Sequence, residues 1–162
     1  MKRFIAPVLL ALMLPACGLQ PLYSGGSKGA VASTLGSIAV EPIQGKSGWL
    51  MRNALSDRLG APQADAAQFR LVVALDDQIE GFGVRADDTV TRERRTLRAR
   101  YQLISRATGE TVLDATAGAD AGIDVVSSEY ATIASENTAL ENLTQRVADQ
   151  IVTRLSLYAG GE

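Results

Sequence analysis

The clearest pattern of apolar and polar positions lies near the end of the chain. Apolar residues recur there at steps of three and four, with charged residues mostly between them. This period is typical of an amphipathic helix with one buried face. We expect the helix over residues 135–157, ended by Gly160 and Gly161. The apolar stripe consists of Leu140, Leu143, Val147, Ile151, Leu155 and Tyr158.

A second helix is predicted over residues 49–59, after a turn at residues 45–48. Its apolar positions also follow helical spacing, and Gly60 and Pro62 come directly after it. The stripe consists of Leu50, Met51, Ala54, Leu55 and Leu59.

Other segments alternate with a period of two, which is typical of strands. A short apolar strand covers residues 37–43, and a longer one covers residues 69–79. After a loop at residues 80–88, a long strand over residues 90–105 is followed by the turn Thr108-Gly109 and a strand over residues 111–119.

The order strand, helix, three strands, helix predicts an α+β fold. The economical arrangement packs two helices on one face of a four-stranded, mostly antiparallel sheet (β-α-β-β-β-α). We expect a single domain over residues 38–159 and a short tail over residues 160–162. The second face of such a sheet must meet solvent or a partner.

The first residues have the features of a secretion signal. Lys2 and Arg3 precede an apolar run over residues 4–14, which is too short to span a bilayer. The ending Leu-Pro-Ala-Cys resembles the lipobox of bacterial lipoproteins, in which the signal is cut before the Cys. Residues 1–16 are therefore expected to be removed. Cys17, the single cysteine, is expected to carry covalent lipid such as palmitate.

Residues 17–37 are expected to form a lipidated start and a flexible tether. Gly and Ser are frequent in this segment, and some 20 residues of this kind span roughly 25 Å. Gly18 stands where Asp retains lipoproteins of enteric bacteria at the inner membrane. We therefore expect a lipid anchor in the outer membrane, with the domain facing the periplasm.

Composition excludes several kinds of chemistry. Histidine is absent, which removes histidine triads, histidine acid–base catalysis and histidine metal sites. Without Lys2 and Arg3 the chain has 14 basic and 18 acidic residues, a net charge of −4, so a general nucleic-acid binder is excluded. We expect no enzyme, no catalytic or metal-binding residues, and no cofactor apart from the lipid on Cys17.

A row of arginines is the most informative feature inside the domain. Leu97, Ala99, Tyr101 and Leu103 should face the core, so four arginines two or more residues apart share the other face. Such a row suits a polyanionic ligand or an acidic protein wall. It is equally typical of a solvated face that discourages edge pairing, with Glu93 and acidic neighbours balancing the charge. The row consists of Arg92, Arg94, Arg98 and Arg100, whereas Arg95 should point toward the core.

Several smaller features have two interpretations each. The pairs Asp76-Asp77 and Asp87-Asp88 are either carboxylate or calcium sites or solvated loop residues, and they lack the spacing of a calcium loop. The segment Gly81-Phe82-Gly83 is either an inserting hairpin tip or a plain turn. Trp49 is either an interface anchor or a packing residue.

Three segments of the chain resemble the LptE family, the lipopolysaccharide-assembly lipoproteins, in its alphaproteobacterial form. The first is Cys-Gly-Leu-Gln-Pro-Leu-Tyr from Cys17, although Leu19 stands where Phe is more usual. The second is Val-Glu-Pro-Ile over residues 40–43, followed by residues 52–59, and the third covers residues 148–155.

The resemblance implies a non-enzymatic protein that binds lipopolysaccharide on its way to the cell surface. It also implies a partner, an LptD-like outer-membrane β-barrel in which the protein sits as a plug and which it helps to assemble. The arginine row (Arg92, Arg94, Arg98, Arg100) would then face lipopolysaccharide phosphates or the barrel wall.

Other functions remain open from the sequence. The main alternative is an auxiliary lipoprotein of a periplasmic lipid-transport ABC system, which shares the lipobox and the early strand and helix. A carboxylate-based hydrolase would need two acidic residues in one cleft, and no pair is singled out. A purely structural envelope lipoprotein would not bind lipopolysaccharide.

Overall fold

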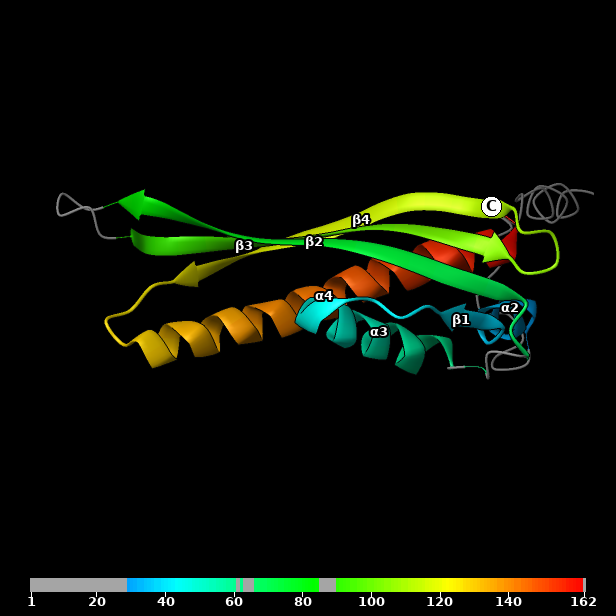
Figure 1. Ribbon diagram of the computed structural model, residues 1–162, viewed down its shortest axis with the longest axis horizontal. Helices are drawn as coiled ribbons and strands as arrows, with labels where there is room; N and C mark the ends of the chain where they lie inside the picture. Colours follow the sequence, from blue (N-terminus) through cyan, green and yellow to red (C-terminus); the bar gives the residue numbers. More distant parts are fainter. Residues whose placement is uncertain (1–28, 61, 63–65, 85–89, 162) are drawn as a thin grey trace, which may run out of the picture.

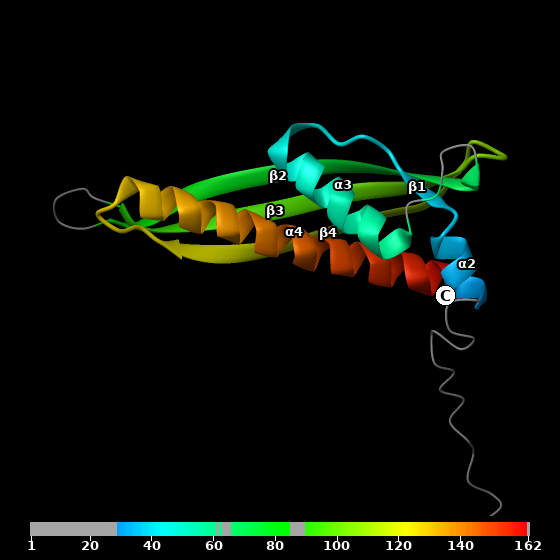
Figure 2. The ribbon, with the colours of Figure 1, turned by 90° about the horizontal axis from the view of Figure 1, so that it is seen from below.

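The computed structural model describes residues 29–60, 62, 66–84 and 90–161. Cys17 and the signal sequence lie outside these residues. Two long helices, α3 and α4, lie on one face of a four-stranded sheet (Figures 1 and 2), which confirms the expected α+β class. In chain order the described elements are α2 (Ala30–Leu35), β1 (Ile38–Val40), α3 (Gly45–Leu59), β2 (Phe69–Val84), β3 (Val90–Ser105), β4 (Thr111–Asp124) and α4 (Glu129–Gly160).

The strands follow one another in the sheet in the order β1-β2-β3-β4. The pairs β2/β3 and β3/β4 are antiparallel, whereas the three-residue strand β1 is parallel to β2. The sheet is therefore mostly antiparallel, as expected. Strand β4 forms one edge, and β1 together with the part of β2 beyond Leu71 forms the other.

The core lies between the sheet and the two helices. Alternate residues of β3 point toward the helices, and Leu97, Tyr101 and Leu103 are almost completely buried there. They meet the apolar stripe of α4, in which Leu143 and Ile151 are fully buried. Each such side chain contributes about 1.5–3 kcal/mol by leaving water. The period-two and period-3.6 patterns of the sequence thus meet in one core.

The hairpin and the last helix are longer than expected. Strand β2 continues to Val84 through the expected loop, strand β4 continues to Asp124, and α4 begins at Glu129. The prediction of a loop at residues 80–88 was wrong for residues 80–84, because backbone pairing such as Phe82 with Arg92 holds this stretch in the sheet. Backbone ladders need no alternation of side chains, so the pattern did not reveal them.

The segment before the sheet differs from the expectation of a tether up to residue 37. Residues 30–35 form the helix α2, which lies beside α4, and Leu35 is buried in the core. Six residues are too few to display a helical period, so contact with the rest of the domain stabilises this helix. Helix α3 likewise begins at Gly45, within the expected turn.

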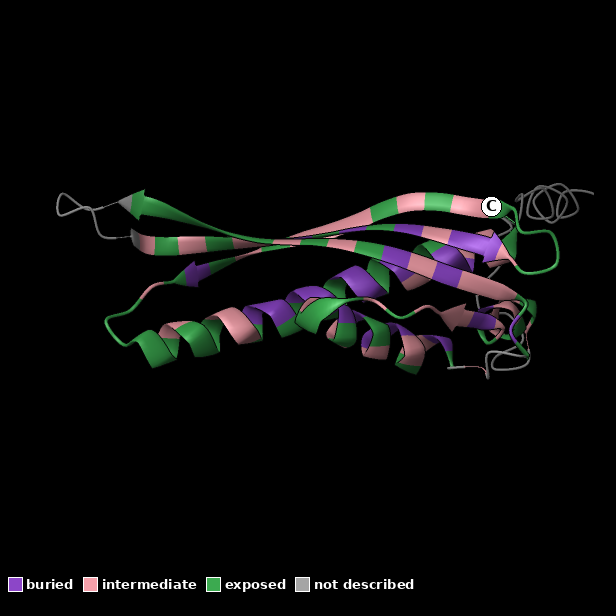
Figure 3. Ribbon diagram, in the orientation of Figure 1, coloured by how far each residue is buried: buried purple, intermediate pink, exposed green. Residues whose placement is uncertain are grey.

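The two layers are unequal in length. Helix α4 has 32 residues, about 48 Å at 1.5 Å per residue, and it runs along the length of the sheet (Figure 1). Helix α3 covers only the half of the sheet near α2, and the buried residues gather in that half (Figure 3). At the other end, the far end of the molecule, α4 alone lies beneath the strands. No helix among the described residues is long and apolar enough to cross a membrane.

Candidate binding surface on the open sheet face

The four residues of the arginine row lie on one face of the sheet. Arg92, Arg94, Arg98 and Arg100 are all exposed, and the residues between them that face α4 are buried or half-buried. We call the side of the sheet away from α3 and α4 the open face. The expected alternation along β3 is therefore confirmed.

Aspartates of the neighbouring strand β4 pair with three of these arginines. Nε of Arg92 lies 3.0 Å from Oδ1 of Asp124, and Nη2 of Arg98 lies 3.1 Å from Oδ1 of Asp120. In the third pair, Nη2 of Arg100 lies 2.9 Å from Oδ2 of Asp114. The row is thus largely charge-balanced, by β4 rather than by Glu93, which lies on the helix-facing side because it is an odd-numbered residue of β3.

Hydrogen bonds and charges on the open face lower the pKa of two of these carboxylates, Asp114 and Asp120. Hydrogen bonds from Arg100 and then Gln102 lower the pKa of Asp114. A hydrogen bond from Thr96 has the largest effect in lowering the pKa of Asp120, and Arg98 adds to it. The hydrogen bond and charge of Asp114 also raise the pKa of Arg100.

Arg94 differs from the other three. Its guanidinium carbon lies 5.4 Å from the centre of the Phe82 ring, a cation–π contact. Among the described residues no carboxylate lies within ion-pair distance of Arg94. Phe82 is itself 40% exposed. This position therefore offers a cation and an aromatic ring to an incoming ligand.

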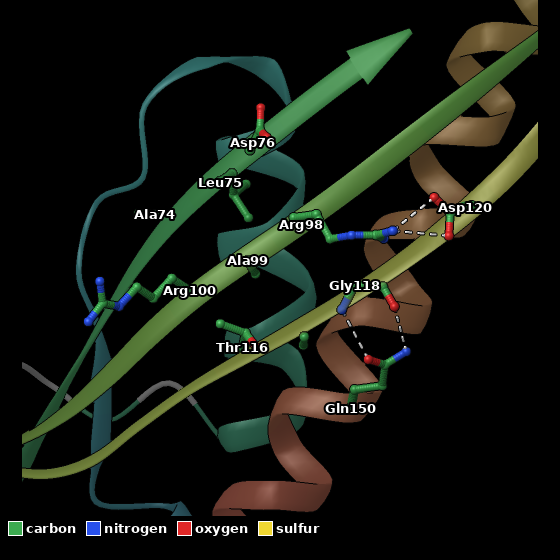
Figure 4. Close-up of a pocket in the computed structure, with 11 residues that line it drawn as sticks. Ala74, Leu75, Asp76, Arg98, Ala99, Arg100, Thr116, Gly118, Asp120 and Gln150 are labelled. Atoms are coloured by element: carbon green, nitrogen blue, oxygen red, sulfur yellow. Dashed lines mark hydrogen bonds and ion pairs between the residues drawn. The ribbon is translucent and has the colours of Figure 1, made fainter. Parts of the chain in front are cut away.

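A hollow of about 700 Å³ lies beside the row (Figure 4). Arg98 reaches across β4 toward Asp120, and its side chain lies over Gly118. A Cβ atom on residue 118 would come within 2.5 Å of Cδ of Arg98, so glycine is what allows this path. Ala74 and Thr116 add further small side chains to the hollow.

The two aspartates at residues 76 and 77 point to opposite faces and form no joint site. Asp76 accepts a hydrogen bond from Gln78 on the open face, whereas Asp77 binds Arg95 on the helix side. Arg95 points toward the helices, as expected, and also donates to the backbone oxygen of Glu136. The pair Asp87-Asp88 lies outside the described residues. The described residues contain no group of three or more side chains suited to a metal ion.

Exposed apolar side chains gather at the far end of the molecule, where α4 alone covers the sheet. Phe82 lies here within β2, so the segment Gly81-Phe82-Gly83 is strand rather than turn. Trp49 is separate from this group, on α3, and at 63% exposure it is not a packing residue. The group, here called the apolar end, consists of Ile79, Phe82, Val126, Tyr130 and Ile133.

The arginine row, its exposure and the inward direction of Arg95 were visible in the sequence. The partners Asp114, Asp120 and Asp124 were missed. The only available signal was that all three occupy even positions of one strand, and that signal gives no register against β3.

The sequence and the fold are similar to those of known proteins. Residues 35–155 match the model of the family described as LptE, lipopolysaccharide-assembly. No curated protein matches the chain in sequence.

Solved structures of bacterial lipoproteins share the fold. A lipoprotein from Caulobacter crescentus is 26% identical with a TM-score of 0.70, over 83% of this chain and 100% of that one. Rare lipoprotein B from Shewanella oneidensis is 11% identical with a TM-score of 0.60, over 77% and 96%. A minor lipoprotein from Acinetobacter baumannii is 14% identical with a TM-score of 0.59, over 75% and 90%. The last two show likeness of fold alone.

Proposed function

Because the chain belongs to the LptE family of lipopolysaccharide-assembly proteins, we propose that it is an outer-membrane lipoprotein that binds lipopolysaccharide. In this proposal it acts as plug and assembly partner of the LptD-like β-barrel that delivers lipopolysaccharide to the cell surface. The observation that carries the proposal is the family match over residues 35–155, which includes all four described strands, α3 and most of α4. The protein is not an enzyme in this role.

The anchor of the protein is the lipid on Cys17. Two or more acyl chains hold a protein stably on a membrane, whereas a single chain does so only marginally. Labelling of cells with radioactive palmitate should mark the wild-type protein and leave Cys17→Ser unlabelled. Equal labelling of both proteins would show that the lipid is not attached to Cys17.

The arginine row is the proposed contact for the phosphates of lipopolysaccharide or for the polar wall of the barrel. Guanidinium groups bind phosphate through two parallel hydrogen bonds. Three members of the row must exchange an aspartate for the new anion, whereas Arg94 contacts a ring and has no carboxylate at ion-pair distance among the residues that the structure describes. Arg94 should therefore contribute more to binding than any one of the paired arginines.

Binding of purified lipopolysaccharide to the purified chain tests this contact. Replacing Arg92, Arg94, Arg98 and Arg100 together with Ser should weaken binding or association with the barrel by about tenfold or more. The loss should be greatest at low salt, where charges are least screened. Arg94→Ser alone should weaken binding more than Arg98→Ser, and Arg52→Ser on α3 is the matched control. If the fourfold variant keeps its fold and both affinities, the row has no role in the function.

Recovery of the tagged protein from outer membranes tests the barrel partnership. A large outer-membrane barrel in stoichiometric amount supports the proposal. An inner-membrane ABC transporter in its place would contradict it and favour the auxiliary lipoprotein of a lipid-transport system.

A further inference from the structure

The outer edge of β4 is partly closed by one side chain. The backbone N–H of Gly118 donates to Oε1 of Gln150, and Nε2 of Gln150 donates back to the Gly118 carbonyl oxygen, each over 3.2 Å (Figure 4). Gly118 therefore turns its backbone groups away from β3. Gln150, from α4, occupies the place where a further strand would bond.

The same edge is open beyond Gly118. Backbone groups alternate in direction along a strand, so Asp120 and Gly122 also turn their N–H and C=O groups outward. Within the described residues we find no cap like Gln150 on either of them. Residues 120–122 of β4 can therefore form backbone hydrogen bonds with a further strand.

This part of the edge also lacks the usual protection against pairing. Edge strands are commonly guarded by lysine, proline, bulges or unpaired charge. Strand β4 contains no lysine or proline, and its one irregularity lies at the other end, opposite Leu103 and Ile104. The charge of Asp120 is engaged by Arg98 and Thr96.

A groove of about 540 Å³ follows the open edge between β4 and α4. Its lining is mixed. Small or apolar residues include Ala121, Gly122 and Ile123 from β4 and Ala139 and Leu143 from α4, and polar residues include Asp124 from β4 and Ser135 and Thr138 from α4. The exposed α4 residues Asn142 and Arg146 form its outer side. An added strand would place every second side chain in this groove and the others on the open face.

We propose that the open edge of β4 at residues 120–124, together with this groove, binds an extended segment of the barrel protein by strand addition. The identity of the partner rests on the proposed function. A closed barrel wall has no free edge, so the segment comes from a part of the partner outside that wall. Its groove-facing residues are small and uncharged, since small, apolar and hydroxyl side chains line the groove. Its other residues include a basic side chain opposite Asp124, which is 77% exposed.

Substitution of proline for Gly122 tests the proposal without disturbing the sheet. Proline is accepted on an edge strand where the missing N–H faces outward, and a Cβ on residue 122 would meet no atom within 4 Å. The matched control is Gly122→Ala, which adds a side chain at the same place without meeting any atom within 4 Å but keeps the outward N–H. Circular dichroism and thermal unfolding verify that both variants remain folded.

Recovery of the barrel from outer membranes should fall about tenfold or more for Gly122→Pro, because a lost and obstructed backbone bond destabilises the whole added strand. Gly122→Ala should recover as much barrel as the wild type. Equal recovery with both variants would overturn the proposal while leaving the barrel partnership intact. If the wild-type protein itself recovers no barrel, the proposed function is wrong, and with it the identity of the partner.

Amide hydrogen exchange separates strand addition from other occupants. In the complex the amides of Asp120 and Gly122 should become protected, whereas that of Thr116 should not. Exchange that is unchanged by the barrel would overturn the proposal. Protection produced by lipopolysaccharide alone, or by raising the concentration of the chain alone, would also overturn it, because the occupant would then be a lipid or a second copy.

Discussion

Arg95 of β3 and Asp77 of β2 form a two-bond ion pair on the helix-facing side of the sheet. Nε of Arg95 lies 2.8 Å from Oδ1 of Asp77, and Nη2 lies 2.7 Å from Oδ2. The two side chains are only 11% and 19% exposed. Nη1 also donates to the backbone oxygen of Glu136, 2.9 Å away. This pair joins β2, β3 and α4 at the point where the apolar core ends.

Loss of one partner of this pair should destabilise the domain. We expect Asp77→Ala to lower the free energy of unfolding by about 2–3 kcal/mol, because it leaves a largely buried guanidinium without its counter-charge. Urea unfolding measures the change. Asp76→Ala is the control, since Asp76 is exposed on the open face, and it should change stability by no more than about 0.5 kcal/mol. If both variants unfold alike, the pair does not stabilise the domain.

Gly118 should control the path of Arg98 across β4. In Gly118→Ala the new methyl group would come within 2.5 Å of Cδ of Arg98, so the guanidinium must leave Asp120. The pKa of Asp120 should then rise, although not fully, because its strongest hydrogen bond comes from Thr96. Carboxyl-carbon NMR titration measures this. Gly122→Ala, which meets no neighbour, should leave the Asp120 titration unchanged; a shift of equal size there would contradict the steric explanation.

The ion pairs of the open face should respond to acid in a defined direction. In the folded chain the pKa of Asp114 lies below its ordinary value, first because Arg100 donates to it. The pair therefore adds stability above the unfolded pKa, and this contribution is lost as the pH falls through the lowered folded value. Arg100→Gln should raise the Asp114 pKa toward normal, with Gln102 retaining part of the effect, as NMR titration can show. An Asp114 titration that does not change in this variant would rule out Arg100 as the main cause.

The two ends of α4 should differ in their contribution to stability. Leu143 is fully buried, so Leu143→Ala should cost about 2–5 kcal/mol in unfolding free energy. Tyr130 is 89% exposed in the apolar end, and Tyr130→Ala should cost no more than about 0.5 kcal/mol. Thermal and urea unfolding of the two variants give the comparison. A large loss with Tyr130→Ala would mean that the first turns of α4 pack more tightly than their exposure indicates.

The amino-acid sequence by itself determined the class of fold and the faces of its main elements. The stripe through Leu143 and Ile151 and the alternation through Leu97 and Tyr101 each repeat at the period of one kind of element, so a helix and a strand follow without any tertiary information. The same alternation put the arginine row on one face and turned Arg95 toward the helices.

Only the tertiary structure decided the lengths of the hairpin and of α4 and the partners of the arginines. Register between strands depends on backbone bonds and on the whole core, and no local pattern encodes which aspartate of β4 comes opposite which arginine. That is why the sequence could suggest acidic neighbours for the row in general but could not assign them to Asp114, Asp120 and Asp124, or set Arg94 apart by its contact with Phe82. The open edge of β4 and the groove beside it exist only once α4 is placed against the sheet.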